Sequence, residues 1–231
     1  MTSQSSRPRL VLASASPRRQ QLLREAGYVF QVDPADIDED DHPADLSPGE
    51  LAEYLAGRKA EVAARRHPGD VILAADTVVA LGKVLLGKPI DAADARRMLG
   101  LLSGSMHQVI TAVAVLRGLP SAATMGIATN DNRPSFMAAD GSPWTIDRPP
   151  EPSVCRVSSA VRMRVLLPDE LEQYVAGGAW SGKAGGYGLQ DPDPFVTCIS
   201  GSPTNIVGLP MDETHRLLTQ AGIEPISPRG H

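Results

Sequence analysis

The sequence has 231 residues, which suits one large domain or two lobes around a cleft. Hydrophobic residues make up 42% and charged residues 21% of it, as in ordinary folded globular proteins. The formal net charge of −5 argues against a general nucleic-acid binder, because such a protein needs a basic face that displaces counterions. A small anionic substrate held by a few local cations stays compatible with this charge.

Features that direct a chain to a membrane or out of the cell are missing from the sequence. No apolar stretch approaches the ~20 residues that span a bilayer, and residues 1–8 lack the hydrophobic region of a secretory signal. Two cysteines, Cys155 and Cys198, are too few for a disulfide framework. We therefore expect a reduced, cytoplasmic protein without membrane or nucleic-acid partners. The histidines show no metal-site spacing, which argues against a zinc enzyme.

Strand and helix patterns alternate along the chain. The expected elements are a strand at 9–13, helices at 16–27 and 47–66, a strand at 71–75, a helix at 91–102, strands at 107–116 and 160–166, and helices at about 169–176 and 211–221. Ser16 is a good N-cap, and Pro17 suits the first helical position. Residues 47–50 have the capping-box form, whereas the continuous apolar run at 71–75 is typical of a strand buried on both faces. Strands alternating with helices indicate an α/β domain.

One segment, 118–159, interrupts this pattern. It is rich in Pro, Gly, Ser, Asn and Asp and shows no sustained periodicity. A loop of this length in a compact domain is normally either functional or disordered. We interpret it as an irregular insertion between two strands, of the kind that can act as a mobile flap, and assign no chemistry to it.

The turn Ser14-Ala-Ser-Pro-Arg-Arg19 lies between the first strand and the first helix. A helix N-terminus favours anions, so Arg18 and Arg19 in the first turn are unfavourable unless a polyanion offsets them. Arginine forks match phosphate oxygens well, and triphosphate is the obvious polyanion. The alternative is that both arginines point into solvent, as many surface arginines do.

Asp76 and Thr77 follow the apolar run at 71–75. In open α/β sheets, ligands gather beyond the carboxyl ends of the strands. A carboxylate there could bind Mg²⁺ or accept a proton from water. The alternative is a plain turn, since aspartate commonly follows a strand for that reason.

Two lysines are further candidates. Lys59 lies on the apolar stripe of its helix, four residues after Leu55 and three before Val62. Either it snorkels to the surface, or it points into a cleft that holds phosphate. Lys88 precedes a proline in a turn and is a weaker signal by itself.

Two segments provide weaker signals. The acidic run 36–41 could supply a ligand for a hard cation, although it lacks the glycine and spacing of a calcium loop, and most of it reads as a solvated loop. The glycine-rich segment 182–190 permits close backbone approach to a ligand. Within it, Lys183 adds a charge and Gln190 can read the edge of a base. The spacing of this segment is not that of a P-loop or a dinucleotide fingerprint.

Seven segments of the chain form an ordered set. They are Ser14-Ala-Ser-Pro-Arg-Arg19, Leu55-Ala-Gly-Arg-Lys-Ala60, Ala75-Asp-Thr-Val-Val79, Gly87-Lys-Pro89, Leu102-Ser-Gly104 with His107, Gly182-Lys-Ala-Gly-Gly-Tyr-Gly-Leu-Gln190, and Val207-Gly-Leu-Pro210. This set resembles the Maf family of nucleoside triphosphate pyrophosphatases. It spans almost the whole chain, and it is much more specific than any single segment. The insertion is longer than the usual connection in the family.

The resemblance implies a single Maf-like domain over 1–231, with the irregular insertion at about 118–159. Its α/β fold would have an elongated, strongly bent mixed sheet flanked by helices, and two lobes around a nucleotide-binding cleft. Proteins of this kind often form homodimers. The resemblance also implies a divalent cation, Mg²⁺ or Mn²⁺, and hydrolysis of the bond between the α and β phosphates.

Site roles follow from the same resemblance, segment by segment. Asp76 is expected to accept the proton of the attacking water and, with Glu39, to hold the metal. The expected contacts to the phosphates are Ser14, Arg18, Lys59 and Lys88. Residues that resemble base-selecting positions are Arg19, Thr77 and Gln190, and Lys183 is expected to bind substrate.

Several of these segments are similar to the branch of the family that acts on dTTP and UTP, which includes modified pyrimidine nucleotides as candidate substrates. The branch acting on 7-methyl-GTP differs at these positions. Two alternatives stay open from the sequence: the same hydrolysis on another or modified base such as 7-methyl-GTP, and a non-catalytic nucleotide-binding regulator of cell division.

Overall fold

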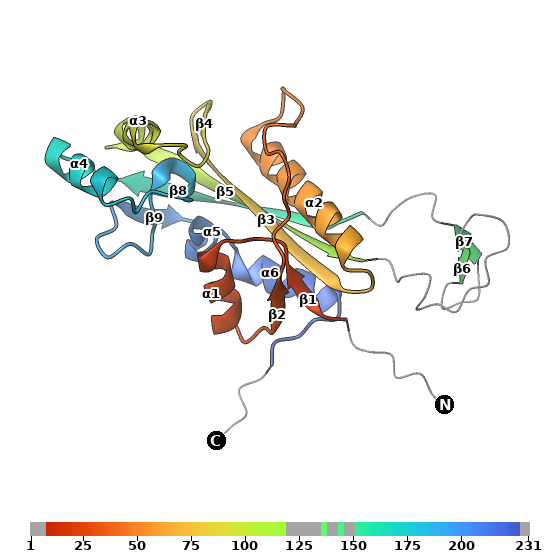
Figure 1. Cartoon of the computed structure of the whole chain (residues 1–231). Coiled ribbons are helices and arrows are strands. Elements are labelled where there is room, and N and C mark those ends of the chain that lie inside the picture. Colours follow the sequence, from red (N-terminus) through yellow and green to blue (C-terminus); the bar gives the residue numbers. More distant parts are fainter. Residues whose placement is uncertain (1–7, 119–134, 138–142, 146–150, 227–231) are drawn as a thin grey trace, which may run out of the picture.

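A mixed seven-stranded sheet organises the protein (Figure 1). The computed structural model describes residues 8–118, 135–137, 143–145 and 151–226. The sheet strands are β1 (Leu10–Leu12), β2 (Phe30–Val32), β3 (Val71–Leu81), β4 (Val84–Leu86), β5 (Met106–Arg117), β8 (Ser153–Met163) and β9 (Val196–Ser200). The helices are α1 (Pro17–Glu25), α2 (Pro48–Arg66), α3 (Ala92–Leu102), α4 (Pro168–Ala176), α5 (Pro203–Val207) and α6 (Met211–Gln220), with a 3₁₀ turn η2 (Ala184–Gly186). The expected α/β fold is thereby confirmed.

The strand order is β2-β1-β3-β5-β8-β9. β1 is parallel to both β2 and β3, whereas β3, β5, β8 and β9 pair in antiparallel fashion. The two short strands β6 (Ser135–Met137) and β7 (Pro143–Thr145) pair with each other in a separate two-stranded sheet. The long strands β3, β5 and β8 therefore connect the end of the molecule at α1 and α6 with the end at α3 and α4 (Figure 1).

Local signals in the sequence start the helices where they were expected. Ser16 caps α1 by accepting a hydrogen bond from the amide of Arg19. Ser47 and Glu50 form the reciprocal capping box of α2, and the side chain of Asp91 caps α3. Each cap satisfies amides that have no partner within the helix, which fixes the first turn.

Both faces of the central strands are buried, which explains their continuous apolar sequence. Leu73 and its alternate neighbours pack against α1 and α6, whereas Ile72 and its alternate neighbours pack against α2. The α2 face of this contact is rich in fully buried alanines, Ala52, Ala56, Ala60 and Ala63. Such small side chains let the helix lie close to the sheet. A third cluster, with α3 and the glycine-rich segment, covers the far end of β3 and β5.

The expected strand at 71–75 ends too early. β3 continues to Leu81, so Asp76 and Thr77 lie within the strand and pair with Ala112 and Thr111 of β5. Their polar side chains break the apolar run in the sequence but do not break the ladder, because backbone hydrogen bonds do not depend on side-chain polarity.

The predicted C-terminal boundary of the irregular segment 118–159 is also wrong, because the strand that follows begins earlier. Residues 153–159 belong to β8 and pair with residues 109–115 of β5. These residues are mostly exposed or half-buried, so the alternation of apolar residues that marks a strand is weak there. The stretches 119–134, 138–142 and 146–150 of the predicted insertion lie outside the described residues. Strands β2, β4 and β9 and helix α5 were not predicted.

Across the described ranges, no helix is both long and apolar enough to cross a membrane.

His107 provides a test of the packing at the far end of the sheet. It is 3% exposed, and its Nε2 lies 2.6 Å from the hydroxyl of Tyr187, while Nδ1 has no partner among the described residues. Burial lowers the pKa of His107 from 6.5 to about 4. As the pH falls, His107 is therefore protonated in the unfolded chain at a higher pH than in the folded protein. The free energy of unfolding decreases as a result between about pH 6.5 and 4.

We expect this histidine to contribute up to about 3 kcal/mol of pH dependence over that window. His107→Gln should have a flatter profile than the wild type when unfolding by urea is measured from pH 7 to 4.5. Parallel profiles for the two proteins would contradict the assignment.

Candidate functional site

A gap in the strand pairing of β3 creates the site. On one edge, β3 pairs with β5 from Val71 to Ala80. The opposite edge pairs with β1 at 71–73 and with β4 at 79–81. Between these two strands, residues 74–78 have no strand on that edge within the described part of the chain. Side chains on both faces of β3 can therefore reach one opening, although neighbouring residues of a strand point to opposite faces.

A cavity of ≈ 420 Å³ lies at this gap. Its volume falls in the range of small-molecule sites. Every site residue predicted from the sequence lines it: Ser14, Arg18, Arg19, Glu39, Lys59, Asp76, Thr77, Lys88, Lys183 and Gln190. The structure thus brings together positions that are up to 176 residues apart in the chain (Ser14 to Gln190).

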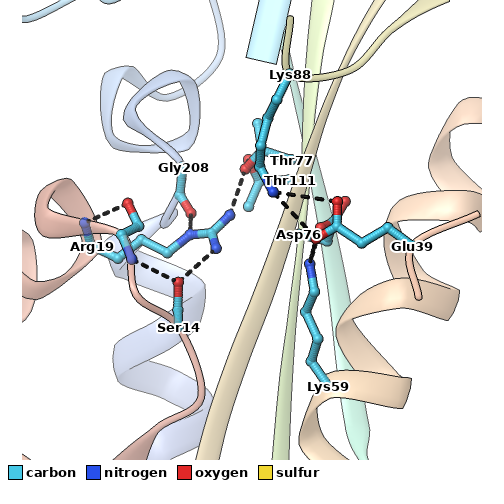
Figure 2. Close-up of polar contacts among 10 residues, drawn as sticks. Ser14, Arg19, Glu39, Lys59, Asp76, Thr77, Lys88, Thr111 and Gly208 are labelled. Carbon is cyan, nitrogen blue, oxygen red and sulfur yellow. Dashed lines mark hydrogen bonds and ion pairs between the residues drawn. The ribbon is translucent and has the colours of Figure 1, made fainter. Parts of the chain in front are cut away.

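Asp76 and Lys59 form a buried ion pair in the lining of the cavity. Lys59 extends from α2 and donates to Oδ1 of Asp76 at 2.6 Å and to Oε1 of Glu39 at 2.7 Å (Figure 2). Asp76 is 5% and Lys59 7% exposed. Lys88 contacts both oxygens of Glu39, at 3.2 and 3.3 Å. Lys59 does not snorkel to the surface, because two carboxylates stabilise its charge in the cleft.

Charge interactions decide the ionisation of Glu39. Partial burial acts to raise its pKa, but the hydrogen bond and the charge of Lys59, together with Lys88, outweigh burial and lower it. Glu39 is therefore a carboxylate at neutral pH. Among the residues 36–41 of the acidic run, it is the one whose carboxylate meets Lys59. The sequence alone singled it out only through the family resemblance.

The carboxylates of Glu39 and Asp76 fit a hard divalent cation. Within the described ranges, no group of three or more His, Cys, Asp or Glu side chains could hold a metal ion. A complete protein cage is therefore not built here. Mg²⁺, however, is commonly bound by one or two carboxylates, with water and substrate phosphates completing its shell. The pair fits a cation that binds together with a phosphorylated ligand.

Arg19 is anchored inside the cavity and does not point into solvent. Its Nε donates to the carbonyl of Gly208 at 2.7 Å, and its two terminal nitrogens donate to Ser14 and Thr77, each at 3.1 Å (Figure 2). Thr77 in turn lies 2.9 Å from the hydroxyl of Thr111. Burial lowers the pKa of Arg19, but the guanidinium stays charged at neutral pH. Within the described residues no carboxylate contacts it directly, so its charge is available to an anion.

Arg18 links the first helix to the glycine-rich segment. Its terminal nitrogen donates to the carbonyl of Gly182 at 3.0 Å. Burial lowers its pKa, and the charge of Asp191 opposes this effect. Lys183 lines the cavity, but its ammonium is paired with Asp191. The expected contact of Lys183 with substrate stays a prediction.

Sequence reasoning gave no role to four residues of the site. Thr111 and Asp191 lie outside the recognised segments, whereas Tyr187 and Gly208 lie within them. Asp191 directly follows the glycine-rich segment 182–190 and is the nearest carboxylate after Lys183, which is the only sequence signal for it. Gly208 acts through its backbone carbonyl, and no side-chain pattern reports such a contact.

The balance of charges in the cavity favours an anion. Five cations line it, namely Arg18, Arg19, Lys59, Lys88 and Lys183, and they face three carboxylates, namely Glu39, Asp76 and Asp191. This local positive excess occurs in a chain whose net charge is −5. Low-dielectric walls strengthen such an excess and concentrate anionic ligands at the site.

Two glycines allow the anchoring of Arg19 to be tested. Gly208 and Gly69 both have positive φ, +113° and +83°. A Cβ at Gly208 would lie 3.3 Å from the Thr77 hydroxyl and 3.5 Å from Arg19 Nε, whereas one at Gly69 would meet no atom within 4 Å. Alanine at either position should cost about 1–2 kcal/mol of stability through backbone strain.

Only Gly208→Ala should also weaken binding of pyrophosphate, used as a probe anion, because it displaces Arg19. The expected loss is about tenfold, the size of one charge-assisted hydrogen bond. Calorimetric titration of both variants measures it. Equal pyrophosphate affinity in Gly208→Ala and Gly69→Ala would show that the anchoring does not matter for anions.

The chain is similar to known proteins over most of its length. The family model described as Maf-like protein matches residues 9–221. A dTTP/UTP pyrophosphatase of Cereibacter sphaeroides is 43% identical over 93% of this chain and 95% of its own length, and one of Symbiobacterium thermophilum is 40% identical over 92% and 94%. A solved dITP/XTP pyrophosphatase from Mycobacterium abscessus covers 94% of this chain and 98% of its own, with a TM-score of 0.37 and 16% identity, too distant to carry weight. The chain belongs to the Maf-like protein family.

Proposed function

We propose that the protein hydrolyses dTTP and UTP to the monophosphate and pyrophosphate. One observation carries the proposal: a buried carboxylate, Asp76, lies in a single cavity with a surplus of cations, at the positions where the chain matches its family. Relatives with 40% and 43% identity over nearly the whole chain are named dTTP/UTP pyrophosphatase, which supports the choice of substrate.

Binding of the triphosphate is the task of the cations. Arg18, Lys59 and Lys88 reach the cavity from three different segments, so they can surround a polyphosphate chain. Their charges would stabilise the departing pyrophosphate in an in-line attack of water on the α-phosphorus. Electrostatic stabilisation of this kind usually contributes most of the rate enhancement in phosphoryl-type displacements.

Asp76 is the proposed proton acceptor. Its Oδ1 accepts a hydrogen bond from the ammonium of Lys59 at 2.6 Å. A phosphate oxygen would compete for the same ammonium. When Lys59 turns toward the phosphate, Oδ1 of Asp76 is released from this hydrogen bond and can accept a proton from water. Substrate binding and activation of the base are thereby coupled.

Mg²⁺ or Mn²⁺ is the proposed cofactor, with Glu39 and Asp76 as its protein ligands. When bound, such an ion neutralises charge on the phosphate oxygens. The fit of these two carboxylates to a shell that the substrate completes is the support for this part of the proposal.

The nucleobase of the substrate is proposed to contact Gln190. This side chain lines the cavity, and the hydrogen bonds within the described part of the chain leave its amide unengaged. An amide offers a donor and an acceptor side by side, which matches the edge of uracil or thymine. Thr77 and Arg19, the other two residues expected to select the base, line the same cavity and are hydrogen-bonded to each other.

Location and assembly stay predictions. Cys155 and Cys198 are both free, which is consistent with the reduced, cytoplasmic location proposed here. The homodimer rests on the family resemblance alone.

A panel of canonical and modified nucleoside triphosphates tests the proposal, with pyrophosphate release measured in Mg²⁺ or Mn²⁺. We expect dTTP and UTP to be the best substrates. Preference for a nucleotide with another base, such as 7-methyl-GTP, would support the hydrolase activity but refute the assignment of dTTP and UTP as substrates. No release from any nucleotide would favour the alternative of a non-catalytic regulator.

Asp76→Asn should lower turnover by about 10²–10⁴-fold, because it removes the proton acceptor. Nucleotide binding, measured by calorimetry, should change little, since the cations are retained. A variant with nearly unchanged turnover would remove Asp76 from the chemistry.

The metal assignment is tested with neighbouring residues of the acidic run. Glu39→Gln should require a higher Mg²⁺ or Mn²⁺ concentration, about 10–100-fold, for half-maximal activity. Asp40→Asn is the matched control, because Asp40 is exposed and its side chain makes no contact with Lys59 or Lys88. A Glu39→Gln titration that overlays the control would place the metal elsewhere.

A further inference from the structure

Asp191 joins three parts of one wall of the cavity. Its Oδ1 is paired with the ammonium of Lys183. Its Oδ2 accepts hydrogen bonds from the hydroxyl of Tyr174 in α4 at 2.8 Å and from the amide of Gly188 at 3.0 Å. We call these four residues, Tyr174, Lys183, Gly188 and Asp191, the loop clamp.

The loop clamp is largely closed to water. The side chains of Lys183 and Asp191 are only 12% and 16% exposed. Burial, followed by the hydrogen bond to Asp191, raises the pKa of Tyr174, so its hydroxyl remains a donor at every physiological pH. Partly buried charges in such contacts are costly to separate, because each loses solvation without regaining a partner.

Backbone geometry shows that the glycine-rich segment is shaped around this contact. A Cβ at Gly188 would lie 2.7 Å from Oδ1 of Asp191 and 2.9 Å from Nζ of Lys183. Only glycine leaves room for the ion pair under the loop at this point. Arg18 holds the start of the same segment through the carbonyl of Gly182, so both ends of the wall are fastened.

Gln190 stands between two fixed neighbours. On one side, Leu189 packs against the hydrophobic cluster at the far end of the sheet. On the other side, Asp191 is held by the loop clamp. The amide of Gln190 is therefore presented to the cavity from a rigid backbone, although its own side chain is not bonded to the protein within the described residues.

We propose that Asp191 is a positioning and specificity-determining residue, which acts by fixing the backbone from which Gln190 contacts the base. The proposal rests on the proposed function of the cavity as a pyrimidine nucleotide site. Asp191 does not touch the reacting phosphates in this scheme. Its loss therefore affects substrate choice and KM, and leaves kcat nearly unchanged.

Asp191→Asn tests the proposal, since it keeps the shape of the side chain but removes the charge that pairs with Lys183. We expect KM for dTTP to rise about tenfold, and the ratio of kcat/KM for dTTP over dCTP to fall about tenfold, with kcat within about twofold of the wild type. Tyr174→Phe removes a single hydrogen bond of the clamp and should show a smaller change in the same direction.

Asp193→Asn is the matched control, because Asp193 lies two residues away and its side chain is 86% exposed. It should behave as the wild type. Thermal unfolding of all three variants separates a general loss of stability from a change in the loop. An unchanged dTTP-to-dCTP ratio in both Asp191→Asn and Tyr174→Phe would overturn the proposal, as would a fall in kcat with KM unaltered.

Activity of the wild type distinguishes a failure of this role from a failure of the proposed function. If the wild type releases no pyrophosphate from dTTP or UTP, the proposed function is wrong and the inference falls with it. If the wild type is active but the Asp191→Asn enzyme keeps its selectivity, only the role of Asp191 is wrong.

Discussion

The gap between β1 and β4 on one edge of β3 is the constraint on which the site depends. At this gap Asp76 faces α2 and meets Lys59, while Thr77 faces the other side of the sheet and meets Arg19. Two consecutive residues on opposite faces of β3 thus both line one cavity. An unbroken strand on that edge would separate these faces. The pairing of β3 with β5 along its other edge keeps the strand rigid where it is open.

Packing and charge reinforce each other at this gap. Buried alanines let α2 lie close to the sheet, which brings the ammonium of Lys59 to the carboxylate of Asp76. The ion pair would be unfavourable to bury alone, but Glu39 adds a second acceptor from a loop. The charges that hold Lys59, Asp76 and Glu39 together are the same charges that a metal-bound triphosphate would rearrange. Stability and proposed catalysis therefore depend on the same few groups.

Local signals explain which parts could be predicted from sequence. Caps at Ser16 and Ser47 and the apolar stripe around Lys59 depend on residues within one or two turns, and the structure confirms them. The end of β3 and the start of β8 depend on ladders with β5, whose partners lie far away in the sequence. Asp191 was missed for a similar reason, since the partner that explains it, Tyr174, belongs to a separate helix.

Hydrolysis of dTTP in ¹⁸O-labelled water tests the central claim most directly, because it reports which phosphorus the water attacks. Attack on the α-phosphorus, which this charge arrangement is proposed to direct, places the label in the monophosphate and leaves the pyrophosphate unlabelled. Mass spectrometry of the two products distinguishes the outcomes. Label in pyrophosphate, or release of orthophosphate, would contradict the proposed mechanism, since the chemistry would then occur at a different phosphate.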